Sequence, residues 1–365
     1  MDFLTKNTIE NLKLIENDKY ILKNNGFIRF LYHSLPFHIK KTKHTIEYNQ
    51  LLDVKKSYIP YDIKTAIYTK KYILYDFIYI FNNYKCIIKI YSEKKININK
   101  YKKYIYSVLF FFIKNKRQDK EKELKFTFYL TDHKKFVKKG ECINEININS
   151  GYTTYDTEEV VIYRKDEWLK VFIHECMHYF NCDFHIGNIN KDINKFFNID
   201  TDILLFEAYT EFFARIINIA VIIFNEYIKL NKTLKNQTNH KNYKKFETKF
   251  KEFINNERIY SIIQMNNVMK LIDIDYKDIP NKLIYNKINE KTNAFCYYYI
   301  TSIYLYNYNY IISFCKNNNN NYIDFNNKNT DLFITFTIYL IKKNICLNVI
   351  KIPNNCNMAL YELSI

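Results

Sequence analysis

The stretch VFIHECMHYF, residues 171–180, decides which fold and which chemistry are expected of this chain. Its apolar positions are typical of a helix, on which His174 and His178 lie on one side about one turn apart. Two imidazoles at this spacing can bind one metal ion, and Glu175 then lies near any water that the metal holds. The alternative is a pair of buried core histidines beside a surface glutamate.

A catalytic zinc site needs a third protein ligand. A helix predicted from about 202 to 228 is apolar almost all round, yet it carries Glu207 and Glu211, four residues apart on one face. Because a buried carboxylate is costly without a partner, we expect one of them to bind the metal and the other to hydrogen-bond a ligand histidine. An ion pair between Glu211 and Arg215 is the alternative, but it leaves Glu207 unexplained.

Together, HECMH at 174–178 and EAYTE at 207–211 resemble the gluzincin pattern of zinc metallopeptidases. The stretch RKDEW at 164–168, which runs into the motif, is similar to uncharacterised metallopeptidases of large DNA viruses, and the specific resemblance covers about residues 145–215. The resemblance implies that Glu207 is the third ligand and that Glu211 hydrogen-bonds a metal-bound histidine; the reverse assignment stays open. The metzincin spacing is not met, because Phe184 stands where a third histidine would be. Asp183 follows His178 too closely to be expected on the same metal.

A substrate strand is expected just before the motif. Residues 142–149 alternate Ile with Asn, which predicts a strand with one polar face that ends at Ser150-Gly151-Tyr152-Thr153-Thr154 beside a cleft. The resemblance implies that this edge pairs with a peptide substrate, with Gly151 and Tyr152 in contact with it. Candidates for stabilising an oxyanion are Tyr297, Tyr298, Tyr299 and His240.

The rest of the pattern predicts an α+β, zincin-like fold with an N-terminal mixed sheet, an active-site helix and a mainly helical C-terminal lobe. Expected strands are 72–81 and 86–91 as a hairpin, 124–130 and 158–163, and expected helices are 101–114, 259–272 and 292–314. Residues 236–240 are expected to form a solvated loop, and the five asparagines at 317–321 are expected to form a disordered connector. The tail contains two segments rich in β-branched residues, at 333–341 and 347–352. The sequence predicts four regions. Residues 1–70 have no clear fold, 71–182 form the lobe with the sheet and the motif helix, 183–316 form a helical lobe, and 317–365 form a tail.

The composition constrains the partners. Lys and Arg number 55 against 38 Asp and Glu, a net charge of +17, but the basic clusters are scattered and A/T-rich codons explain much of the lysine. A nucleic-acid partner is therefore not expected. The eight cysteines form no close pairs, no signal-peptide core follows Met1, and the apolar runs are too short to span a bilayer. These features predict an intracellular protein, in a host cytoplasm or a virion if it is viral, without a membrane span.

The sequence therefore predicts a peptidase that binds one Zn²⁺ through His174, His178 and Glu207 and uses Glu175 as the general base on a peptide or protein substrate. The alternatives are a catalytically silent zincin-fold structural or binding protein and, less favoured, a basic nucleic-acid-binding protein.

Overall fold

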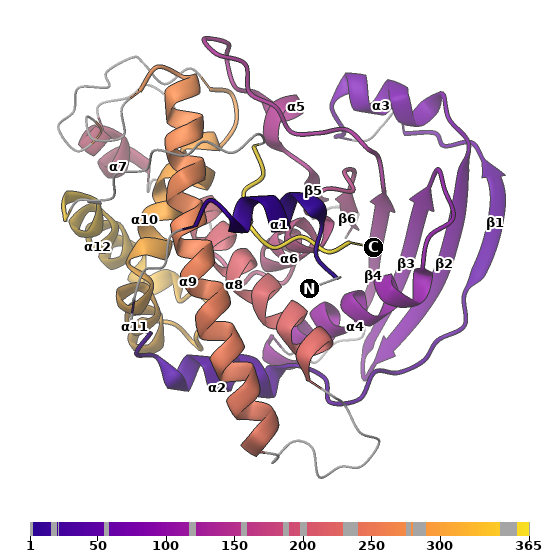
Figure 1. The fold of residues 1–365 in the computed structure, drawn as a ribbon, viewed down its shortest axis with the longest axis horizontal. Coiled ribbons are helices and arrows are strands. Elements are labelled where there is room, and N and C mark those ends of the chain that lie inside the picture. Colours follow the sequence, from indigo (N-terminus) through magenta and orange to yellow (C-terminus); the bar gives the residue numbers. More distant parts are fainter. Residues whose placement is uncertain are drawn as a thin grey trace.

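A six-stranded mixed sheet forms one side of the molecule in the computed structural model (Figure 1). The structure describes residues 3–15, 20, 22–54, 58–116, 122–154, 159–184, 190–197, 203–228, 240–274, 279, 290–343 and 356–364. The strand order is β1-β2-β3-β4-β6-β5; β3, β4 and β6 run parallel, and the other neighbours pair antiparallel. The strands are β1 (Thr45–Gln50), β2 (Tyr72–Phe81), β3 (Tyr84–Ser92), β4 (Lys122–Tyr129), β5 (Gly151–Thr154) and β6 (Glu159–Ile162). The predicted strands near 72–91, 124–130 and 158–163 are thereby confirmed.

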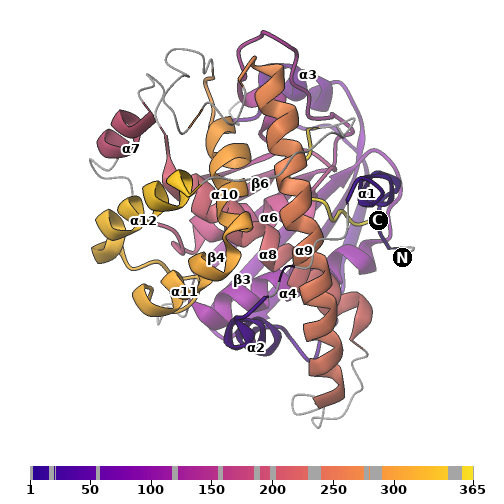
Figure 2. The same cartoon turned by 60° about the vertical axis from the view of Figure 1, so that its left-hand side comes forward.

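Helices pack in layers on one face of the sheet (Figure 2). Next to the strands lie α4 (Ile98–Asn115) and α6 (Trp168–Tyr179), where Phe172 makes edge-to-face contacts with Phe126 and Phe128 of β4. The long helix α8 (Leu205–Tyr227) packs on α6, and α9 (His240–Leu271) packs on α8. This stacking brings the motif helix and the acidic helix face to face, and the chain is an α+β protein.

The remaining helices surround this stack. On the opposite face of the sheet α3 (Tyr61–Tyr68) buries Ile63 and Ile67 against Val161 of β6. The others are α1 (Lys6–Leu12), α2 (Asn25–Ser34), α5 (Glu145–Ile148), α7 (Asn190–Phe197), the π-helix η3 (Phe295–Ile300), α10 (Thr301–Tyr306), α11 (Tyr308–Asn318), the 3₁₀ turn η4 (Asn327–Asn329) and α12 (Thr330–Lys342). No helix among the described residues is long and apolar enough to cross a bilayer.

The two ends of the described chain lie side by side. Leu4 and Leu363 form an isolated antiparallel bridge, and residues 356–363 are all buried. Within this segment the backbone N–H of Ala359 donates to the carboxylate of Glu167, at the N-terminus of α6, and that of Leu360 donates to Glu257 of α9. The C-terminal segment therefore belongs to the core beside the motif helix.

The local structure differs from the predictions at four places, and it contradicts two of them, the strand at 142–149 and the disorder of 317–321. Residues 142–149 are not a strand, because Asn144 caps the short helix α5 in a capping box with Asn147. The helix predicted from 259 begins at His240, since phenylalanines at 246, 250 and 253 form a buried stripe among the lysines.

The asparagines at 317–321 are ordered: Asn319 donates to Tyr209 and Asn321 donates to the carbonyl of Asn115. The tail segment 333–341 is helical, within α12, because it buries Phe333, Thr337 and Leu340 on one side. The predictions for 236–239 and 347–352 lie outside the described residues.

Candidate metal centre

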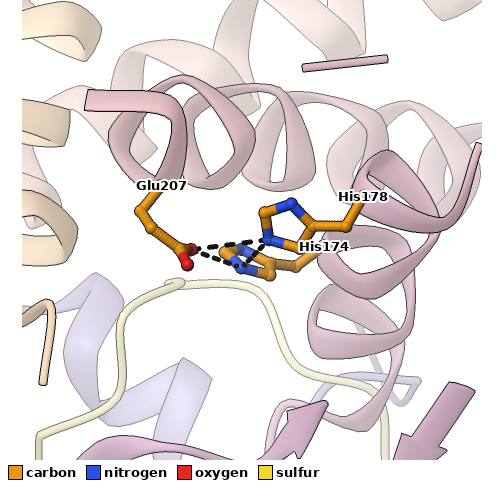
Figure 3. A group of neighbouring side chains, drawn as sticks. All are labelled: His174, His178 and Glu207. Carbon is orange, nitrogen blue, oxygen red and sulfur yellow. Dashed lines mark hydrogen bonds and ion pairs between the residues drawn. The ribbon is translucent and has the colours of Figure 1, made fainter. Parts of the chain in front are cut away.

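The two histidines of the motif lie on the face of α6 that meets α8 (Figure 3). Both are at least nine-tenths buried, and their Nε2 atoms are 3.1 Å apart. This arrangement is the one expected from their spacing of four residues, since i and i+4 side chains lie on the same helix face.

Glu207, in the first turn of α8, supplies a third donor atom. Its Oε2 lies 3.2 Å from Nε2 of His174 and 3.4 Å from Nε2 of His178. Ligands bound about 2.0–2.1 Å from a tetrahedral zinc ion stand about 3.3–3.4 Å from one another. The three donors are therefore close to three corners of such a tetrahedron, and no other group of this kind is found in the described part of the chain.

The other nitrogen of each ring faces a carboxylate. Nδ1 of His174 lies 3.1 Å from Oε2 of Glu211, and Nδ1 of His178 lies 2.6 Å from Oδ2 of Asp183. A carboxylate accepts hydrogen bonds, so it fixes the tautomer in which Nδ1 carries the proton and Nε2 carries a lone pair. In this tautomer the lone pairs of both Nε2 atoms and of the Glu207 oxygen point toward one another. A cation between them would stabilise this arrangement.

The electrostatics of the site also favour positive charge. Burial lowers the pKa of His178, but the carboxylates of Asp183 and Glu207 outweigh it and raise that pKa well above its usual value. Burial raises the pKa of Glu207, but both histidines outweigh it and lower that pKa far below its ordinary range. A proton or a metal ion can supply the positive charge that the carboxylates require, and zinc binding would replace the proton.

Glu211 is held by cations on its other sides. Nζ of Lys170 lies 3.1 Å from Oε2 of Glu211, and Nε of Arg215 donates to its Oε1 at 2.9 Å. Burial raises the pKa of Glu211, but Lys170 and Arg215 lower it well below its usual value. The ion pair with Arg215 and the hydrogen bond to His174 therefore coexist, and Glu207 is the acid that lies among the three donors.

Glu175 lies on α6 between the histidines and the sheet. Its Oε2 accepts a 2.8 Å hydrogen bond from the hydroxyl of Thr153 on β5. Burial raises the pKa of Glu175, and the two histidines and Thr153 offset only part of this effect. A carboxylate whose pKa lies above its usual value is better matched to accept a proton near neutral pH.

Tyr297 is the one member of the four oxyanion candidates that lies at this site. Its hydroxyl donates to Oε2 of Glu207 at 3.1 Å, and its ring meets that of His174 edge to face. It belongs to the π-helix η3, a conformation that often occurs at functional sites. Tyr298 instead donates to the carbonyl of Cys356, Tyr299 stacks on Phe295, and His240 is exposed at the start of α9.

Strand β5 is the edge of the sheet next to the motif helix. A Cβ atom on Gly151 would lie 2.8 Å from Cγ1 of Val171, so the glycine lets β5 approach α6 closely. The N–H of Tyr163 on the β6 side donates to the carbonyl of Ser150. In an antiparallel pair of strands, every second residue directs its N–H and C=O toward the neighbouring strand. Since Ser150 is bonded to β6, the N–H and C=O groups of Gly151 and Thr153 point away from β6, toward the free edge.

Two hollows adjoin this strand. A groove of about 520 Å³ runs along it and is lined by Gly151–Thr154, Tyr58, Glu145, Asn149 and Tyr163. A cavity of about 40 Å³ reaches from Ser150 and Gly151 to His174 and Glu175. Tyr152 points to the face opposite Gly151, where its ring contacts Tyr58. The groove and the cavity share Asn149 and Gly151, so the two hollows adjoin at the start of β5.

The structure brings His174, Glu175, His178, Glu207, Glu211 and Gly151 into one site. Sequence reasoning missed Asp183 and Thr153 as partners of the site. Asp183 is not expected on the metal because it follows His178 closely, and the structure places it instead against Nδ1 of that ring. No family model, curated protein or solved structure matches this chain.

Proposed function

We propose that the protein is a zinc-dependent peptidase of the gluzincin type. The proposal rests on three lone-pair donors, Nε2 of His174, Nε2 of His178 and Oε2 of Glu207, which lie 3.1–3.4 Å from one another. In addition, a carboxylate lies against Nδ1 of each histidine ring. Donors arranged in this way match a tetrahedral zinc site with one position left for water or substrate. When bound, zinc would supply a Lewis acid that polarises the scissile carbonyl and acidifies water.

Glu175 is the proposed general base. Its buried carboxylate would accept a proton from the attacking water and then deliver it to the leaving amine. The hydrogen bond from Thr153 holds that carboxylate between β5 and the histidines. Burial and the acids Glu207 and Glu175 raise the pKa of Tyr297 well above its usual value, so its hydroxyl stays protonated and can donate to the developing oxyanion.

Strand β5 is the proposed binding edge for the substrate backbone. An extended peptide can add to a free sheet edge through main-chain hydrogen bonds, and the outward-facing groups of Gly151 and Thr153 provide them. This position agrees with the zincin resemblance, in which the edge strand before the motif helix pairs with the peptide.

The test is hydrolysis of a quenched fluorescent peptide library by the zinc-loaded protein and by Glu175→Gln. We expect the variant to bind zinc as the wild type does and to lose at least about 10²–10⁴-fold in kcat/KM, the usual contribution of a general base. Full activity in Glu175→Gln would refute the mechanism. Tight zinc binding without cleavage of any peptide would instead identify a catalytically silent zincin-like protein.

A further inference from the structure

The 40 Å³ cavity beside the candidate metal centre is lined by several hydrogen-bond donors and by the carboxylates of Glu175 and Glu211. Its lining includes His174 and Glu175 of the candidate site together with Lys135, Lys170 and Ser150. Met358 of the C-terminal segment, which passes close to the site in Figure 3, also lines the cavity. The volume is enough for about three water molecules or one carboxylate group.

Three of the side chains that line this cavity have donor groups with capacity to spare. Ser150 is 4% exposed, and its Oγ has no hydrogen-bond partner among the described residues. Nζ of Lys135 lies 2.5 Å from Glu167, and Nζ of Lys170 lies 3.1 Å from Glu211 and 3.5 Å from the sulfur of Met358. An ammonium group has three N–H bonds. Each lysine therefore has donor capacity beyond its carboxylate partner.

The acids around the cavity are already neutralised. Glu167 binds Lys135 and the N–H of Ala359, and Glu211 binds Lys170, Arg215 and His174. Glu175 is the remaining acid of the lining, and it lies on the side of the metal donors. Burying unpaired donors costs free energy, so a ligand with acceptor oxygens and a negative charge fits this cavity best.

We propose that this cavity binds a carboxylate of the substrate, which sits next to the scissile bond. The carboxylate belongs either to an Asp or Glu side chain or to the C-terminus of the peptide, because both carry the same group. The inference rests on the peptidase function proposed above and specifies its substrate class. A basic side chain would meet two lysines there, and a large apolar one exceeds the volume.

The test uses the full chain loaded with one equivalent of zinc and three short peptide hydroxamates that differ only in their acid. The first carries Asp next to the hydroxamate with an amidated C-terminus, the second Asn with the same amide, and the third Asn with a free C-terminal carboxylate. We expect the first or the third to bind at least about tenfold more tightly than the second, since a carboxylate makes stronger hydrogen bonds to these donors than an amide does. Whichever binds more tightly identifies the source of the carboxylate.

Two variants localise the effect. Ser150→Ala should reduce the preference for the carboxylate by about fivefold through loss of one hydrogen bond, whereas Ser34→Ala, a buried serine on α2, should leave it unchanged. The double variant Lys135→Met, Glu167→Gln removes a cation together with its acid, so no buried charge is left unpaired, and should reduce the preference further.

Equal binding of all three hydroxamates, or tighter binding of the Asn amide, would overturn the carboxylate pocket while leaving the peptidase assignment intact. Failure of the protein to bind zinc or any hydroxamate would overturn that assignment and this inference together. If the preference for the carboxylate persists in both Ser150→Ala and the double variant, this pocket is not the origin of the preference.

Discussion

Asp183 should control how tightly the protein binds zinc, although it does not lie among the three donor atoms. Its Oδ2 lies 2.6 Å from Nδ1 of His178, a short charge-assisted hydrogen bond in a buried setting. Asp183→Asn keeps an acceptor oxygen but loses the charge, and Asp183→Ala loses both. We therefore expect zinc affinity to fall in two steps.

The size of each step follows from the hydrogen bond. A hydrogen bond to a charged group contributes about 1.5–3 kcal/mol and a neutral one about 0.5–1.5 kcal/mol, so Asp183→Asn should cost about 1–1.5 kcal/mol, or about tenfold in Kd for zinc. Asp183→Ala leaves the Nδ1–H of His178 without its acceptor and frees the ring to rotate. Its Kd should rise by about 100-fold, the upper end of the range for such partners of metal-bound histidines.

The assay is competition for zinc with a chromophoric chelator at fixed pH, with circular dichroism to verify the fold of each variant. Asp166→Asn is the control, because Asp166 pairs with Lys134 on the surface near the start of α6 and away from the donor atoms. Its affinity should equal that of the wild type. Wild-type zinc affinity in Asp183→Ala would refute the idea that this carboxylate holds His178 for metal binding.

Three further predictions concern the neighbours of the site. Tyr297→Phe should retain zinc and lower kcat by about 10²–10³-fold, the loss seen when one oxyanion donor is removed; an unchanged kcat would exclude Tyr297 from that role. Thr153→Val removes a hydrogen bond that lowers the pKa of Glu175. Since the base must be ionised, the acidic limb of the kcat/KM–pH profile should move to higher pH, and an unshifted limb would contradict the assignment of Glu175. Gly151→Ala places a Cβ 2.8 Å from Cγ1 of Val171, 2.9 Å from Cδ1 of Ile162 and 3.0 Å from the carbonyl oxygen of Val161, so β5 or these side chains must shift. We expect a loss of about 1–3 kcal/mol in the free energy of unfolding and a higher KM. Thermal and kinetic behaviour like the wild type would show that β5 does not need this close approach.

The sequence alone predicted the helices whose own residue pattern determines their position. Helical spacing within an apolar run located α6 and α8, and the cost of burying Glu207 and Glu211 on an apolar helix indicated that each has a partner. The sequence could not decide which acid lies with the two Nε2 atoms as the third donor. That choice depends on Lys170 and Arg215, which hold Glu211 on the far side of His174.

Side-chain hydrogen bonds, local in one case and tertiary in the others, decided what the sequence did not predict. The alternating Ile and Asn of 142–149 fit a strand, but the asparagine side chains satisfy a helix N-terminus instead. The asparagines of 317–321 have the composition of a connector, and they are ordered by hydrogen bonds to Tyr209 and Asn115, which are remote in sequence. Asp183 was missed for the same reason, because its role depends on the path of the turn after α6.

The central claim is that His174, His178 and Glu207 together bind one zinc ion. The most direct measurement is zinc K-edge X-ray absorption on the full chain, with metal content determined on the same sample. The account predicts one zinc per chain in a shell of nitrogen and oxygen neighbours at about 2.0–2.1 Å, with two imidazoles, and loss of that signal in His178→Ala. No bound zinc, or a shell dominated by sulfur at about 2.3 Å, would contradict it.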